Sequence, residues 1–82
     1  MTRAQLLAQA EGLILDAEEA CDRMAQIDPS RVYLARSVVD DAVRAYVLIE
    51  TSARLTARVR MQLSAYYVRA RFLSDALNAP LQ

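Results

Sequence analysis

From residue 30 to residue 77 the chain runs for 48 consecutive residues without a glycine or a proline. Glycine and proline are the two residues least compatible with a helix interior, and this segment is rich in alanine, leucine, valine and arginine instead. We therefore predict helix over nearly the whole segment and an all-α fold. Two arrangements are open: one long helix, or two helices that meet at a corner.

A shorter helix precedes this segment. Thr2 and Gln5 have the spacing of a capping box, which predicts that the helix begins near Arg3. Asp28-Pro29-Ser30 ends it, because a residue before proline is pushed out of the helical conformation. So tight a connection makes the next helix an antiparallel neighbour. Apolar residues in the first helix follow a heptad seam with alternating spacings of four and three: Leu6, Ala10, Leu13, Ala17, Ala20, Met24 and Ile27.

The apolar stripe changes direction near residue 50. The first stripe consists of Val32, Ala35, Val38, Val39, Ala42, Val43, Tyr46, Ile49 and Ala53. The second stripe, after residue 54, consists of Leu55, Val59, Leu63, Tyr66, Ala70, Leu73 and Leu77. At about 100° per residue the second stripe is rotated by roughly 100° from the first. Either the chain turns there, or one continuous helix meets a different partner in its second half.

Two observations favour the continuous helix. Residues 50–54 include none that readily takes a positive φ, and Glu50 and Arg54 have the spacing of a stabilising ion pair across the same point. We therefore predict an antiparallel helical hairpin with a long second helix, over about residues 3–27 and 29–78, that self-associates into a dimeric helical bundle. The alternative is a three-helix bundle with a corner near residues 50–53.

Length and composition limit the class of protein. We predict a single α-helical domain over residues 1–82, and a domain this small buries only about 60% of its unfolded surface, which favours oligomerisation, as a homodimer, or a bound protein partner. The sequence contains neither a secretory signal nor an apolar run near the roughly 20 residues of a membrane span, and Cys21 is the single cysteine. We expect a cytoplasmic protein without membrane contact. All ten basic residues are arginine, as is typical of a GC-rich bacterial gene.

The residues needed for most enzymes are missing. The chain has no histidine and one glycine, which excludes the usual neutral-pH acid–base catalyst and a glycine-rich phosphate loop. The acidic pairs Glu18-Glu19 and Asp40-Asp41 are adjacent, so on a helix their carboxylates diverge by about 100° and are predicted to face solvent. We expect a protein that is not an enzyme, with no catalytic residues, no cofactor and no metal site.

The zero net charge hides an asymmetry between the two ends. Residues 1–30 carry two arginines and six acids (2 − 6 = −4), and residues 51–82 carry five arginines and one acid (5 − 1 = +4). We interpret the acids of the first helix as partners for these arginines; a phosphate-binding surface and an acidic protein partner are the alternatives. The candidate electrostatic contacts are Arg54, Arg58, Arg60, Arg69 and Arg71.

A second apolar stripe follows residue 60, on the side roughly opposite Val59 and Leu63. It consists of Met61, Ala65, Val68 and Phe72, with spacings of four, three and four. A helix with two opposed apolar faces needs cover on both, either from a second subunit or from a partner helix. This stripe is the candidate protein-binding face.

These observations favour a non-enzymatic protein–protein interaction module, a small helical regulatory, adaptor or chaperone-like protein that binds a partner helix. The alternative function is a nucleic-acid-associated regulator that uses the arginine-rich C-terminal helix.

Overall fold

A computed structural model describes residues 1–78 of the chain and shows three α-helices. They are α1 (Arg3–Ile27), α2 (Val32–Thr51) and α3 (Ala57–Leu77), with a 3-10 turn, η1 (Pro29–Arg31), between the first two. Over residues 1–78 the chain forms no strand, which confirms the all-α prediction. None of the helices in this range is long and apolar enough to cross a membrane.

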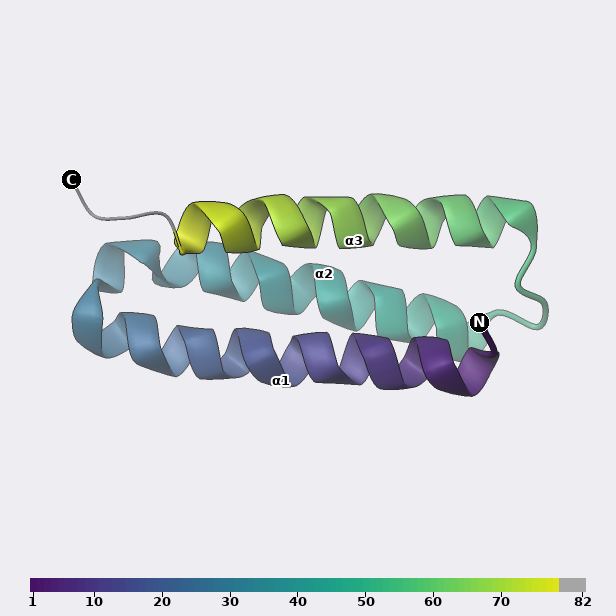
Figure 1. The fold of residues 1–82 in the computed structure, drawn as a ribbon, viewed down its shortest axis with the longest axis horizontal. Coiled ribbons are helices and arrows are strands. Elements are labelled where there is room, and N and C mark those ends of the chain that lie inside the picture. The colour runs from purple at the N-terminus through teal and green to yellow at the C-terminus, as the bar shows by residue number, and fades with distance from the viewer. Residues whose placement is uncertain (79–82) are drawn as a thin grey trace.

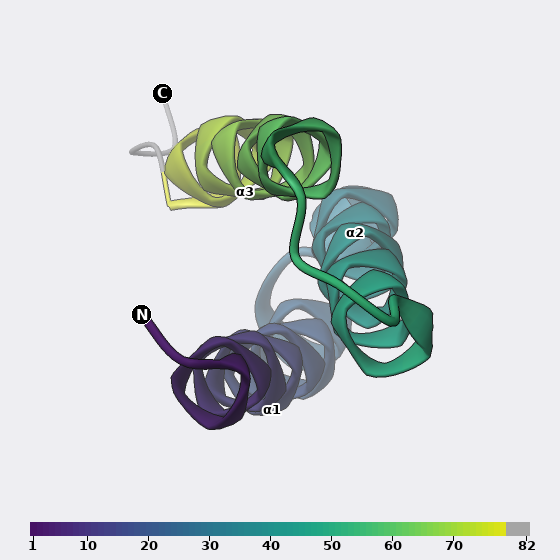
Figure 2. The same cartoon turned by 90° about the vertical axis from the view of Figure 1, so that its right-hand side faces the viewer.

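Helix α2 lies at the centre of the arrangement. Figure 1 shows α1, α2 and α3 as successive antiparallel helices along the long axis of the molecule, with α2 between the other two in this view; the molecule is 44 × 18 × 17 Å in extent. Viewed from its end, α1 and α3 both pack along α2 and contact each other much less (Figure 2). Most of the core is therefore built on one face of α2.

The first helix begins where the sequence predicts. The capping box forms: the Gln5 amide nitrogen donates to Thr2 Oγ1 at 3.2 Å, and the Thr2 amide nitrogen donates to Gln5 Oε1 at 2.8 Å. Most of the predicted seam is buried, but Leu13 is half-buried and Ile27, the last residue of the helix, is 61% exposed. The seam faces α2 and α3, and three of its buried residues are Ala10, Ala17 and Ala20, which allow close packing.

The predicted long second helix is wrong. Helix α2 ends at Thr51, α3 begins at Ala57, and residues 52–56 reverse the chain. The alternative three-helix arrangement is the one found, with its corner slightly later than residues 50–53. In a continuous helix the stripe that follows residue 54 would need a partner such as the second subunit of the predicted dimer, whereas α2 and α1 of the same chain cover it here. The oligomeric state itself stays a prediction.

The corner forms without any residue of positive φ. Ser52 has φ −82° and ψ 121°, and Thr56 has φ −68° and ψ 166°, which are extended conformations open to every residue. The Ser52 hydroxyl donates to the Leu48 carbonyl oxygen, and the Thr56 hydroxyl accepts from the Val59 amide at 3.3 Å. Serine and threonine therefore end one helix and start the next through side-chain hydrogen bonds, which a search for glycine does not detect.

Two arginines fasten the helix ends to each other. Arg3 donates to the carbonyl oxygen of Ile49 near the end of α2, and to that of Ala53 at 3.2 Å. Arg31 donates to the carbonyl oxygen of Leu77, the last residue of α3, at 3.1 Å. The carbonyl groups of Ile49 and Leu77 lie in the last turns of α2 and α3, where no later amide of the same helix is in position to bond them. Each arginine therefore places a cation at the negative end of a helix dipole.

The reversal explains why the apolar stripe rotates. The α3 residues that follow the second stripe, Leu63, Ala70 and Leu77, are 3%, 1% and 4% exposed and pack against α1 and α2. On α2 the floor of the core is made of small or branched residues: Ala35, Val38, Ala42, Ala45 and Ile49. A stripe that changes direction within a glycine-free segment here marks a corner between two helices.

Replacing Thr56 with alanine distinguishes a corner from a continuous helix. At an N-cap the change removes a hydrogen bond, so we expect the free energy of unfolding to fall by about 0.5–2 kcal/mol. In a helix interior alanine is the better residue, and the same change would raise stability by a few tenths of a kcal/mol. Urea denaturation of Thr56→Ala, with Thr56→Ser as a control that keeps the hydroxyl, gives the sign.

Candidate protein-binding surface

The α3 outer face, defined as Met61, Ala65, Val68 and Phe72, is exposed along its whole length. Met61, Val68 and Phe72 are 73%, 66% and 72% exposed, and Ala65 is exposed as well. With Ser64 and Arg69 these residues line a shallow hollow of about 630 Å³. The opposite side of α3 is buried against α1 and α2, while these four apolar positions face solvent.

Four of the five candidate arginines lie on α3 and border this face. Helical periodicity places Arg58 and Arg69 along one edge of the α3 outer face and Arg60 and Arg71 along the other. Arg54 lies in the connection before α3, apart from the other four. The four α3 arginines therefore form two basic edges with an apolar strip between them.

Within the described part of one chain, the acids of α1 do not pair with these arginines, and pairing between subunits stays a prediction. Among residues 1–78, no salt bridge joins an acid of α1 to an arginine of α3; Arg69 instead pairs with Asp41 of α2, with 3.3 Å between Arg69 Nε and Asp41 Oδ2. Arg60 donates from Nε to the carbonyl oxygen of Leu55 at 3.3 Å. Arg58 and Arg71 make no salt bridge within the described residues.

Asp41 is buried, although the sequence predicted it to face solvent. It is 1% exposed, and Arg44 Nη1 lies 3.8 Å from its other carboxylate oxygen. Asp40 is exposed, as predicted. A signal was present, because Val38, Asp41 and Ala45 follow the spacing of three and four that marks the buried side of α2. The burial of Asp41 places a negative charge at the α2–α3 contact, beneath the edge of the α3 outer face that carries Arg69.

Tyr67 contributes a second unusual buried group. Its hydroxyl oxygen is enclosed and has no hydrogen-bond partner among residues 1–78, and burial raises the pKa of Tyr67 above its usual 10.0. The ring packs against Leu6 and Leu63 and lines a hollow of about 320 Å³ where α1 meets α3. Val68 lines the same hollow and the one on the α3 outer face, so the two apolar surfaces are continuous.

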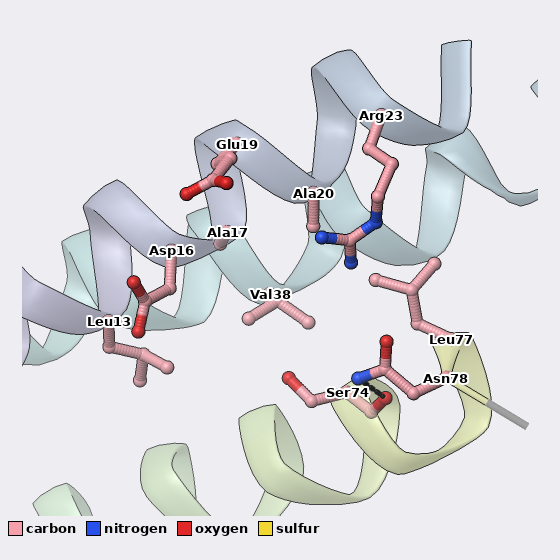
Figure 3. A pocket seen from close by; sticks show the side chains of 10 residues that line it. All are labelled: Leu13, Asp16, Ala17, Glu19, Ala20, Arg23, Val38, Ser74, Leu77 and Asn78. Carbon is pink, nitrogen blue, oxygen red and sulfur yellow. Dashed lines mark hydrogen bonds between the residues drawn. The ribbon is translucent and has the colours of Figure 1, made fainter. Parts of the chain in front are cut away.

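A second hollow lies farther along the contact between α1 and α3. Figure 3 shows it from close by, with Asp16, Glu19 and Arg23 of α1 on one side and Ser74 and Asn78 on the other. Its volume is about 310 Å³, and its floor is aliphatic. The Asn78 side chain donates to the Ser74 carbonyl oxygen at 2.9 Å, and so is engaged locally. Carboxylates and a guanidinium at an exposed rim are consistent with solvation and do not form an enclosed polar centre.

Cys21 lies half-buried on the other side of α1, beside Arg36, Val39 and Asp40 of α2. Burial raises the pKa of its thiol above 9.0; Arg36 opposes this shift, while Asp22 and Glu18 add to it. The thiol is therefore protonated and weakly reactive near neutral pH. Over residues 1–78, no three His, Cys, Asp or Glu side chains are grouped so that they could hold a metal ion.

No protein-family model matches this chain, and neither a curated protein nor a solved structure is significantly similar to it. The α3 outer face, its arginine edges and the buried Asp41 are therefore the observations from which a function can be inferred.

Removing Arg69 tests the buried carboxylate. Arg69→Ala leaves Asp41 buried without its nearest cation, and we expect it to lower the free energy of unfolding by about 1–3 kcal/mol, reduced from the usual cost because Arg69 is itself solvent-exposed. Arg58→Ala, on the same edge of α3 but without an ion pair, should change stability by less than about 0.5 kcal/mol. Adding Asp41→Asn to Arg69→Ala should restore part of the loss. The free energies of unfolding are measured by urea denaturation. If Arg69→Ala and Arg58→Ala lowered them equally, the predicted role of the Arg69–Asp41 ion pair would be wrong.

Tyr67→Phe removes a buried hydroxyl that lacks a partner. We expect the free energy of unfolding at pH 7 to rise by about 0.5–1 kcal/mol. Burial raises the pKa of Tyr67 in the folded protein, so above pH 10 ionisation of this hydroxyl favours the unfolded chain. The stability of the wild type should therefore fall as the pH rises from 10 through the folded-state pKa. The variant has no hydroxyl at this position to ionise and should lose less stability over the same range. Tyr33→Phe, on a side chain that is 66% exposed, is the matched control and should behave as the wild type.

Proposed function

We propose that this protein is a non-enzymatic protein–protein interaction module, of the regulatory or adaptor kind, that holds an amphipathic helix of another protein against α3. One observation carries the proposal: Met61, Val68 and Phe72 are 73%, 66% and 72% exposed on a helix whose opposite side is already buried. Scattered exposed apolar residues are ordinary, but four positions in helical register form a continuous strip.

The dimensions of the strip suit a helix. From Met61 to Phe72 it extends about 16 Å, three turns at about 1.5 Å per residue, and its spacings of four, three and four match the apolar side of a second helix. Covering a large apolar side chain contributes about 1.5–3 kcal/mol before the costs of association. Met61 is unbranched and adaptable, and Phe72 supplies a large rigid surface, so the two ends of the strip offer complementary anchors.

The arrangement of the arginines favours a protein partner over a nucleic acid. A phosphate backbone is best matched by cations gathered on one surface, whereas an apolar strip separates the two arginine edges of α3. The acids of α1 further lower the net charge of the molecule, which is zero at pH 7.

The proposal is tested by selecting helical peptides from a displayed library against the folded protein and measuring affinity for its variants. Met61→Asp or Phe72→Asp should weaken binding of the selected peptides by about 30-fold or more, since a charge is placed at one of the two large apolar anchors of the strip. Leu15→Asp is the matched control, because Leu15 is 59% exposed on α1 and lies away from the α3 outer face. Circular dichroism should show unchanged helicity in all three variants. Peptides that bind all three variants as tightly as the wild type would contradict the proposal.

A further inference from the structure

We infer that the helix bound on the α3 outer face is acidic, with aspartate or glutamate bordering its apolar stripe, and that it comes from another protein rather than from a second copy of this chain. This inference rests on the proposed function and adds the chemistry of the partner.

The positive charge of α3 favours an acidic partner. Between Ala57 and Leu77 the helix carries Arg58, Arg60, Arg69 and Arg71 against the single acid Asp75, which gives a net charge of +3 (4 − 1). Two arginines follow each edge of the α3 outer face, and so both edges of a helix laid along it face cations. In paired helices these flanking positions select partners by charge.

Most of these cations are available. Arg69 is held by Asp41, but Arg58, Arg60 and Arg71 are exposed and form no salt bridge within the described part of the chain. A carboxylate on a bound helix would therefore gain an ion pair without breaking one. Each exposed pair changes a binding constant by only about two- to fivefold, but three or four together decide between partners of opposite charge.

A second copy fits this surface poorly through its own α3 outer face or through α1. Pairing two α3 helices through their outer faces would assemble eight arginines and two aspartates, a net charge of +6 (2 × 3), around one contact. Helix α1 offers the opposite charge on its outer side, where Glu11, Glu18 and Asp22 are exposed. Among residues 1–78, however, that side carries a single large exposed apolar residue, Leu15, and lacks a strip to match the α3 outer face.

Two synthetic peptides test the inference. Both are 21-residue helices with leucine at four positions spaced four, three and four; glutamate borders the leucines in one, and lysine borders them in the other. At 50 mM salt we expect the glutamate peptide to bind the protein about 10- to 100-fold more tightly, with a smaller ratio at 500 mM salt because the edges are solvent-exposed.

Charge reversal on α3 should invert this preference. In the triple variant Arg58→Glu, Arg60→Glu and Arg71→Glu the lysine peptide should bind more tightly than the glutamate peptide. The matched control reverses three exposed arginines elsewhere, Arg23→Glu, Arg36→Glu and Arg54→Glu, which gives the same change in net charge. It should keep the preference of the wild type, and Arg69 is left intact in both because it pairs with Asp41.

The remaining outcomes separate this inference from the proposed function. If both peptides bind equally and Phe72→Asp weakens both, the acidic partner is wrong while helix binding stands. A dimer in sedimentation equilibrium that Phe72→Asp dissociates would make a second copy the occupant and would overturn the inference. If neither peptide binds but a 20-base-pair DNA duplex does, and the α3 triple variant loses it, both the inference and the proposed function are wrong.

Discussion

The reversal of the chain at residues 52–56 determines what the rest of the molecule presents to solvent. It returns α3 along α2, which allows the short chain to cover Leu63, Ala70 and Leu77 without a second subunit. The same return leaves the opposite side of α3 uncovered. Without the reversal, residues 57–77 would extend away from the bundle with two apolar sides exposed; with it, one side belongs to the core and the other is open to a partner.

Because α3 has two apolar sides, something has to select which one faces the core. Leucine at positions 63 and 77 fills the space along α2, and Asp41, 1% exposed, places a buried carboxylate 3.3 Å from Arg69 at the edge of the contact. A half-turn of α3 about its axis would carry Arg69 away and leave that carboxylate to the more distant Arg44, at 3.8 Å, which is costly in a buried site. The ion pair therefore favours the rotation in which Met61, Val68 and Phe72 face outward. The orientation of the α3 outer face and the stability of the core therefore depend on the same residues.

Much of the fold follows from periodicity and capping. The start of α1, its seam and its end before Pro29 could be predicted, because these features depend on local residues. The corner could not be located by looking for glycine, since Ser52 and Thr56 take extended conformations and cap the helix ends with their hydroxyls. The abrupt rotation of the apolar stripe was a better indicator of the corner than the lack of helix breakers, which favoured a continuous helix.

Part of the candidate site could likewise be predicted from the sequence, and part could not. The spacing of Met61, Ala65, Val68 and Phe72 was enough to predict an apolar face opposite the core, because a single helix determines it. The partner of Arg69 was not predictable in this manner, since it depends on how α2 and α3 are rotated against each other; only its place on the buried stripe of α2 hinted that Asp41 lies inside. Contacts between helices, including those of Arg3 and Arg31 with distant carbonyl groups, need the tertiary structure.

The most direct test of this account is the distance between spin labels at Tyr33→Cys and Ala76→Cys in a Cys21→Ser background, with the labelled protein diluted in unlabelled protein. Both sites lie at the end of the bundle where Arg31 contacts Leu77, so the account predicts a single distance well below the 44 Å length of the molecule. In a continuous second helix the same sites, 43 residues apart, would be separated by about 64 Å. A population near that longer distance would contradict the reversal, and with it the division of α3 into a buried face and an exposed face.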